Sequence, residues 1–280
     1  MAITIFVRHK FREDYVNEAL WKDKRIGIGF DRIRSANPDE YKVPGGKSGM
    51  RRLKECTQPQ TIIAATYSNH DDTIIIGSVS PQSETKFWET KDIDGDLMIV
   101  KWLPLEHWKE VNYLDYPVLL AAQPRGGTIF RWKTLSSELL SHILDGTRLR
   151  RKVRLLHPSQ LEVLCYEYML MEGVLTHLVM PIGRTLRDVD IWGVGDEGGT
   201  VLAQVTFGDD SRTLEKKMRN LVELGRKDSK AKLLFFGPRS GNAVAISAVK
   251  YIPIEDVFTS LDEDSIHGGH SLISKMLGRE

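Results

Sequence analysis

Acidic and amide side chains in the second half of the chain are of the types that bind divalent cations. Glu162 lies in the first turn of a predicted helix, Asp188 and Asp190 lie at a predicted strand, and Gln204 lies inside another strand. Carboxylate and carbonyl oxygens hold hard cations, and metal-dependent hydrolysis of a phosphodiester also needs a positive group near the phosphate or the attacking water. Metal-dependent phosphodiester hydrolysis is therefore one chemistry that these residue types could perform.

These acidic residues also fit purely structural roles. Ser159-x-x-Glu162 has the spacing of a capping box, in which both side chains bind free amides at the start of a helix. The structural and metal-binding roles of Glu162 can coexist. Glu162 lies about 100° from Leu161, at the edge of the apolar face, so it could lean toward the sheet. Asp188 and Asp190 alternate with apolar residues and are expected to share one strand face, where either could be the ligand or simply exposed.

Hydrophobic periodicity predicts an α/β layer around these residues. Helices are expected from residue 158 and over residues 211–224, with apolar residues at helical spacing. Strands are expected over residues 189–192, 201–207 and 233–236. This order indicates a mixed sheet flanked by helices. A buried amide without a partner in the second strand would cost about 1–3 kcal/mol, so Gln204 is expected to be hydrogen-bonded or metal-bound.

Two short motifs in this half resemble the nuclease domain of Mrr-type restriction endonucleases, which has the PD-(D/E)xK-like nuclease fold. The motifs are Asp188-Val189-Asp190-Ile191 and Ala203-Gln204-Val205, preceded by the helix that carries Glu162. Their order and spacing resemble the family over roughly residues 155–250. The resemblance implies that Glu162, Asp190 and Gln204 take the metal-binding positions. It also implies Mg²⁺ as the ion, with Mn²⁺ as an alternative.

The chain departs from this family at its lysine position. That position, two residues after Gln204, is Thr206, which carries no charge. Lys217, in the next helix, lies about 60° from Leu214 on the edge of the apolar face, whereas Lys216 points to solvent. Lys217 is therefore the candidate for a displaced catalytic cation. Alternatively, the aliphatic stem of Lys217 only covers apolar surface while its charge stays in water.

The first half of the chain is predicted to be rich in short strands. β-branched and aromatic runs separated by turns predict strands over residues 3–7, 26–30, 61–66, 73–79, 97–103 and 128–132. A helix is expected over residues 12–22, and Pro44-Gly45-Gly46 is read as a turn. We therefore expect residues 1–133 to form a mostly antiparallel, barrel-like domain with helices at its margins, which makes the whole chain an α+β or α/β protein.

Residues 21–33 and the segment Val100-Lys101-Trp102-Leu103 resemble the PUA-like fold, which includes the EVE and YTH readers of modified bases. Such readers flip a modified base into an aromatic cage. The resemblance implies a modified-nucleic-acid sensor in residues 1–133. The candidates for its pocket are aromatic residues, each of which could instead pack in the core: Trp21, Phe30, Tyr67, Trp88 and Trp102.

A basic stretch lies between the two halves. Five cations occur within seven residues: Arg148, Arg150, Arg151, Lys152 and Arg154. They could contact phosphates without reading sequence, or they could form a solvated surface. With the helix expected over residues 134–145, which ends at Gly146, they make residues 134–157 a helical and basic linker. The nuclease-like domain is then expected over residues 158–280.

The composition limits the remaining alternatives. The 280 residues are 41% hydrophobic and 28% charged, with a net charge of +1 and two cysteines in different halves. No signal peptide, membrane span or disulfide framework is expected, so the sequence indicates an intracellular, cytoplasmic protein with no membrane partner. The function expected is a DNA-directed restriction or antiviral-defence nuclease. The alternatives are a catalytically inactive nucleic-acid-binding protein and a regulatory subunit, and the oligomeric state, a homodimer included, stays open.

Overall fold

The computed structural model describes residues 3–183, 188–244 and 246–278 of the chain. It contains two compact units, Met1–Arg150 and Arg151–Glu280. Helix α4 (Ser137–Asp145), expected in a linker, belongs to the first unit, where it packs on β3 and β4 through Leu139, Leu140 and Ile143. It ends at Gly146 in the left-handed conformation that glycine favours, as the sequence predicted.

The first unit contains two open sheets. The five-stranded sheet has the order β7-β4-β3-β1-β8, and the three-stranded sheet has the order β2-β6-β5. The strands are β1 (Ile3–His9), β2 (Arg25–Ile28), β3 (Thr61–Tyr67), β4 (Thr73–Ser78), β5 (Lys86–Lys91), β6 (Leu97–Pro104), β7 (His107–Asn112) and β8 (Ile129–Arg131). The β1–β3 pair is parallel, and the other strand pairs described in this unit are antiparallel.

The strands described in this unit do not close a barrel, so the barrel-like expectation is corrected. Strands β7 and β8 are the edges of one sheet, and β2 and β5 are the edges of the other. The two sheets instead share an apolar core, in which Ile5 and Ile63 of the larger sheet and Ile26 and Val100 of the smaller one are fully buried. Sequence periodicity fixes which face of a strand is buried but not which strand is its neighbour, so it could not distinguish these arrangements.

Helices α1 (Asp14–Lys22), α2 (Pro44–Glu55) and α3 (Pro117–Ala121) complete the first unit. Pro44-Gly45-Gly46, expected as a turn, instead begins α2, because proline is well suited to the first helical position. Gly49 of α2 lets the Phe30 ring approach the helix, since a β-carbon there would lie 3.0 Å from that ring.

The loop after β2 is held by a buried lysine. Lys101 of β6 is fully buried, and its Nζ donates hydrogen bonds of 2.5 Å to the backbone oxygens of Phe30 and Asp31. Burial lowers the pKa of Lys101 to about 8, although the Asp31 charge opposes the shift. This contact joins the two segments that resemble the PUA-like fold.

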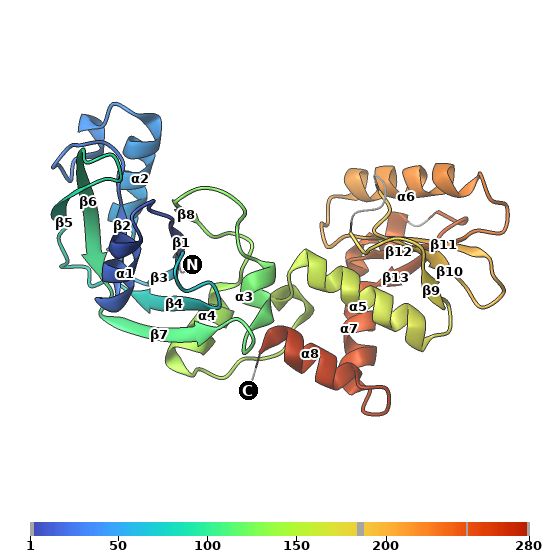
Figure 1. The fold of residues 1–280 in the computed structure, drawn as a ribbon. Coiled ribbons are helices and arrows are strands. Elements are labelled where there is room, and N and C mark those ends of the chain that lie inside the picture. The colour runs from blue at the N-terminus through green and yellow to red at the C-terminus, as the bar shows by residue number, and fades with distance from the viewer. Residues whose placement is uncertain (1–2, 184–187, 245, 279–280) are drawn as a thin grey trace. The chain divides into compact units, whose positions relative to one another are not determined.

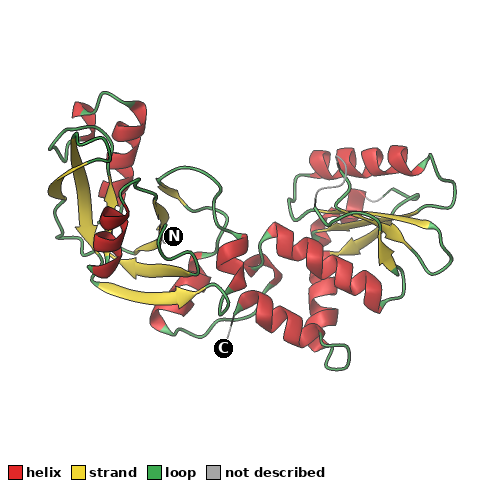
Figure 2. Ribbon diagram, in the orientation of Figure 1, coloured by secondary structure: helices red, strands yellow, loops and turns green. Residues whose placement is uncertain are grey.

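The second unit is a mixed sheet flanked by helices, as expected (Figures 1 and 2). Its order is β13-β12-β11-β10-β9, with β11, β12 and β13 parallel and β10 and β9 antiparallel. The strands are β9 (His177–Leu178), β10 (Ile191–Val194), β11 (Thr200–Val205), β12 (Lys232–Gly237) and β13 (Lys250–Pro253). Helix α6 (Ser211–Gly225) covers one face, and α5 (Pro158–Met171) and α7 (Ile254–Glu263) cover the other; α8 (Gly269–Leu277) packs on α7 (Figure 1).

Candidate functional site

Asp190 and Gln204 are in direct contact at one end of the mixed sheet. Strand β10 begins immediately after Asp190, and its pairing with β11 places Ile191 opposite Ala203. The Gln204 Nε2 therefore donates a hydrogen bond of 2.5 Å to the Asp190 Oδ2, and the Val205 amide donates to the same oxygen at 2.8 Å. The strand register, together with a carboxylate just outside the strand, thus builds one side of the site.

The side-chain oxygen of Gln204 has no hydrogen-bond partner among the described residues. Gln204 is 3% exposed, and within the described residues its buried Oε1 accepts no hydrogen bond. An unpartnered buried acceptor costs about 1–3 kcal/mol, unless a ligand satisfies it. An amide oxygen beside a carboxylate is a donor set that fits a hard divalent cation.

Glu162 is not used to cap its helix, which corrects the expectation of a Ser159–Glu162 capping box. Pro158 occupies the first helical position, so His157 is the N-cap residue. The His157 side chain accepts from the Ser159 amide, and the Gln160 Oε1 accepts from the His157 amide at 3.0 Å. The capping pair is therefore shifted by two residues, and the Glu162 carboxylate is available to the site.

The carboxyl groups of Glu162 and Asp190 lie close enough to influence each other. Burial, followed by the charge of Asp190, raises the pKa of Glu162 to about 7. The pKa of Asp190 is also raised, chiefly by burial, while its hydrogen bond from Val205 opposes the shift. Two half-buried carboxyl groups in each other's field favour either protonation of one of them or a bound cation.

Among the described residues, Lys217 is the cation whose charge affects the pKa of both carboxyl groups. Its charge lowers the pKa of Glu162 and that of Asp190, opposing the effect of burial in each case. Lys217 is half-buried on α6, whereas Lys216 is exposed, as helical geometry predicted. Thr206, at the family's lysine position, is half-buried, and its amide donates to the Phe236 oxygen at 2.9 Å.

Asp188 does not share a strand face with Asp190, contrary to the expectation from alternation. Its φ is 65°, in the left-handed region, so the backbone turns before β10 begins. Asn220 Nδ2 donates a hydrogen bond of 2.6 Å to Asp188 Oδ2. The charge of Asp188 still reaches the site, because it contributes to the raised pKa of Asp190. Asn220 lies three residues after Lys217 on α6, and sequence reasoning missed it.

The donor set is limited to two carboxylates and one amide. In the parts of the chain that the structure describes, no three His, Cys, Asp or Glu side chains gather as a metal site. Mg²⁺ is often held by one or two carboxylates, with water and substrate phosphates filling its other positions, so Glu162, Asp190 and Gln204 fit such an ion.

Cys165, one turn after Glu162, is buried, and burial raises the pKa of its thiol, so it stays protonated.

The basic stretch is divided by the boundary between the two units. Arg148 and Arg150 are exposed and belong to the first unit. Arg151, Lys152 and Arg154 belong to the second, where Arg151 is half-buried and forms a 3.0 Å ion pair with Asp262. Arg151 therefore has a structural role within its own unit.

The five aromatic candidates all lie in or against one apolar core of the first unit, with Tyr67 inside it and the other four packed on it. Trp21 stacks on His70 with 3.8 Å between ring centroids, and Tyr67 stacks on His9 at 4.3 Å. Trp88 meets Tyr15 edge-on at 6.2 Å, and the Arg25 guanidinium lies 4.0 Å from the Trp102 ring. Phe30 packs against α2. None of the ring contacts described within residues 3–150 joins two of the five candidates.

Comparisons with known proteins identify no family for the chain. No family model matches it, and no curated protein matches it. A solved structure, described as the crystal structure of a repair endonuclease from Pyrococcus abyssi, matches with 10% identity and a TM-score of 0.27. The match covers 66% of this chain and 78% of that chain. At this identity and TM-score it carries no argument about fold or activity.

Among the helices in the described ranges, none is both long and apolar enough to cross a membrane.

Proposed function

We propose that the second unit is a metal-dependent nuclease that hydrolyses phosphodiesters of DNA. The observation that carries the proposal is the grouping of Glu162, Asp190, Gln204 and Lys217 at one end of the sheet. Two carboxyl groups and an unpartnered amide oxygen lie beside a lysine, which is the combination of ligands and positive charge that this hydrolysis needs.

In this proposal each side chain has a defined task. Glu162 and Asp190 hold Mg²⁺, or Mn²⁺ in its place, and the Gln204 oxygen completes the protein's ligands. The bound ion supplies Lewis acidity and lowers the pKa of water. The Gln204 Nε2 and Val205 amide keep the Asp190 carboxylate oriented. Lys217 stabilises the negative charge that develops on the phosphate oxygens as water adds to phosphorus and the ester oxygen leaves.

We further propose that the first unit reads modified nucleic acid and directs this nuclease, as in a restriction or antiviral-defence protein of the cytoplasm. The PUA-like resemblance of residues 21–33 supports this role, and Arg148 and Arg150 supply exposed charge for phosphate contacts. The domains are proposed as a sensor over residues 1–133, a helical and basic linker over 134–157, whose helix α4 packs in the first unit, and a nuclease over 158–280. A homodimer is compatible with this arrangement.

Thr206 favours a second candidate function, a catalytically inactive nuclease-fold protein that binds nucleic acid or regulates a partner. This residue supplies no charge at the position where the resembling family has lysine. The competing proposal therefore depends on whether Lys217 performs the missing role.

A cleavage assay with the full chain tests the proposal. Modified and unmodified plasmids are incubated with Mg²⁺, with Mn²⁺ and with a chelator. We expect metal-dependent nicking that Glu162→Gln and Asp190→Asn abolish, and that Glu167→Gln on the same helix leaves intact. DNA binding without nicking would favour the inactive protein, and the absence of salt-dependent DNA binding would favour a regulatory subunit.

A further inference from the structure

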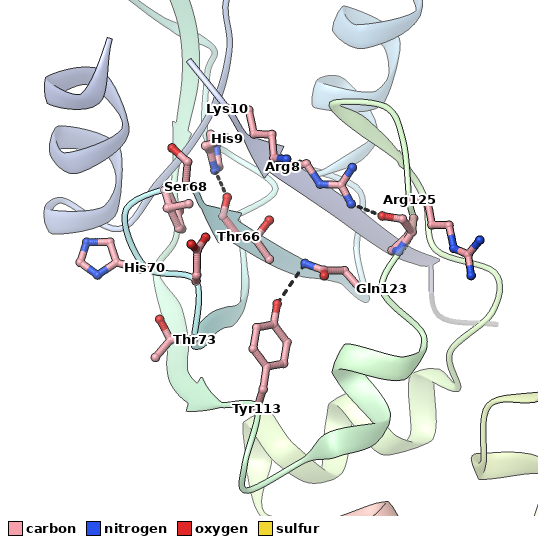
Figure 3. A pocket seen from close by; sticks show the side chains of 13 residues that line it. Arg8, His9, Lys10, Thr66, Ser68, His70, Thr73, Tyr113, Gln123 and Arg125 are labelled. Carbon is pink, nitrogen blue, oxygen red and sulfur yellow. Dashed lines mark hydrogen bonds between the residues drawn. The ribbon is translucent and has the colours of Figure 1, made fainter. Parts of the chain in front are cut away.

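The first unit contains a cavity that the nuclease proposal does not use. Its volume is about 340 Å³, within the range of about 300–1,000 Å³ that is usual for small-molecule sites. Polar and cationic side chains line it, among them Arg8, Lys10, Thr66, Tyr113, Gln123 and Arg125 (Figure 3).

The cavity lies where two parallel strands end. Strands β1 and β3 run in the same direction, with His9 opposite Tyr67 at their carboxyl ends. The residues that follow, Lys10 and Ser68, line the cavity, together with Thr73 at the start of β4. The carboxyl ends of parallel strands are common ligand sites, because the chain leaves the sheet there and its loops diverge.

Three cations line this cavity without a carboxylate partner. Arg8 is half-buried, Lys10 and Arg125 are exposed, and none of the three forms an ion pair within the described residues. By contrast, Arg52 and Arg131 of the same unit both pair with Glu55. Because the lining residues described include one carboxylate against these three cations, the cavity carries excess positive charge.

Hydrogen bonds hold Arg8, Gln123 and Tyr113 of the cavity in place. Arg8 Nη2 donates to the Pro124 oxygen (Figure 3). Gln123 Nε2 donates to the Tyr113 hydroxyl at 3.2 Å, which leaves the hydroxyl proton available to another acceptor. Burial raises the pKa of Tyr113, so the hydroxyl keeps that proton.

His9 supports the cavity rather than binding a ligand. The Gly27 amide donates to its Nε2 at 2.9 Å, so its Nδ1 carries the proton and donates to the Thr66 oxygen at 3.0 Å. Burial lowers the pKa of His9 to about 4, which keeps the ring neutral. Both ring nitrogens are thus engaged, and the ends of β1 and β3 are fixed to each other.

We propose that this cavity binds the phosphate group of a nucleotide. A phosphate is a compact acceptor of several hydrogen bonds, and it suits an arginine, a lysine and a phenolic hydroxyl that line one cavity from different segments. The cavity's volume of about 340 Å³ is in the range of small-molecule sites, so we assign the phosphate to a single nucleotide, either free in solution or at the end of a DNA strand. The inference rests on the first unit alone and does not require the nuclease centre.

Isothermal titration calorimetry with the full chain, in a chelator that prevents cleavage, tests the inference. The probes are a deoxynucleoside monophosphate, the same nucleoside without phosphate, and a short single-stranded DNA with or without a terminal phosphate. We expect the monophosphate to bind and the nucleoside to bind at least about tenfold more weakly. Tighter binding of the phosphorylated strand identifies a strand end as the source of the phosphate, and tighter binding of the monophosphate identifies a free nucleotide.

Charge variants assign the binding to this cavity. Lys10→Ala and Arg125→Ala should each weaken monophosphate binding about tenfold, and Asp71→Asn, which removes the lining carboxylate, should strengthen it. Lys91→Ala, an exposed lysine of β5 in the other sheet, is the matched control and should change nothing. Unchanged affinity in both Lys10→Ala and Arg125→Ala, or equal binding of nucleoside and monophosphate, overturns the inference. Asp190→Asn should leave this binding intact, which separates its outcome from that of the nuclease proposal.

Discussion

The carboxylate of Glu162 lies against the α-carbon of Gly183. A β-carbon at residue 183 would meet the Glu162 Oε2, so the loop can approach this carboxylate only because residue 183 has no side chain. Gly183 has a φ of 75°, which glycine adopts readily, and its amide donates to the backbone oxygen of Asp190 at 2.8 Å. This one glycine therefore contacts both carboxylate residues of the proposed centre.

Gly183→Ala should disrupt the centre more than its backbone cost alone explains. An alanine in the left-handed conformation costs about 1–2 kcal/mol of stability, and here its methyl group would also displace Glu162. Gly198→Ala is the matched control, because Gly198 has a φ of 73° and nothing within 4 Å of an added β-carbon. Thermal unfolding should show a larger loss for Gly183→Ala, and plasmid cleavage should fall only in that variant. Equal effects of the two substitutions would show that the contact between Gly183 and Glu162 does not support the centre.

The parts of the site that sequence could predict are those set by local geometry. The burial of Lys217 and the exposure of Lys216 follow from helical periodicity, and the structure confirms that difference. Asn220 and Gly183 could not be found in this way, because their roles depend on contacts with Asp188 and Glu162, which lie far from them in the sequence. The metal-binding role of Glu162 stays a prediction.

The strands of the first unit likewise divide into those that local sequence predicts and those that it does not. Strands with strong apolar runs, such as β3 and β4, were predicted nearly to their ends. Strands β5 and β7 were missed, because both are edge strands whose exposed, polar residues give no apolar alternation. Their positions are fixed by backbone pairing with β6 and β4, which a single sequence does not reveal.

The raised pKa of Glu162 predicts a pH dependence of stability in the metal-free protein. The folded-state pKa is about 7 against an ordinary value of 4.5, so the folded state binds more protons between these two values. The contribution of Glu162 is therefore fully present below pH 4.5 and is lost as the pH rises through about 7. Denaturant unfolding across this window should show wild type losing stability relative to Glu162→Gln. Parallel curves for the two proteins would contradict the shift.

Metal binding should reverse this trend, because a cation competes with the proton for the carboxylates. Mg²⁺ should raise the melting temperature of wild type more above pH 7 than at pH 5, and should have little effect on Glu162→Gln. A rise of equal size in both proteins would place the ion at another site.

Arg148 and Arg150 are expected to contribute to DNA binding through charge alone. Both are exposed, whereas Arg151 of the same stretch is paired with Asp262. If each contacts one phosphate, replacing both with alanine should weaken binding to all sequences and reduce the slope of log K against log salt by about 2. Fluorescence anisotropy at several salt concentrations measures this slope. An unchanged slope would leave these residues as a solvated surface.

Lys217 and Thr206 together decide whether the protein is an enzyme or a binder. Because Lys217 acts on both carboxyl groups, Lys217→Ala should reduce metal-dependent cleavage by about a hundredfold or more, while DNA binding and folding stay nearly intact. Lys216→Ala removes the same charge from the exposed side of α6 and should do little. Thr206→Lys in the Lys217→Ala background should restore part of the activity, since it returns a cation to the family's position. Cleavage by Thr206→Lys but not by wild type would show that the centre has lost its chemistry and only binds, and equal rates for wild type and Lys217→Ala would show that another group supplies the charge.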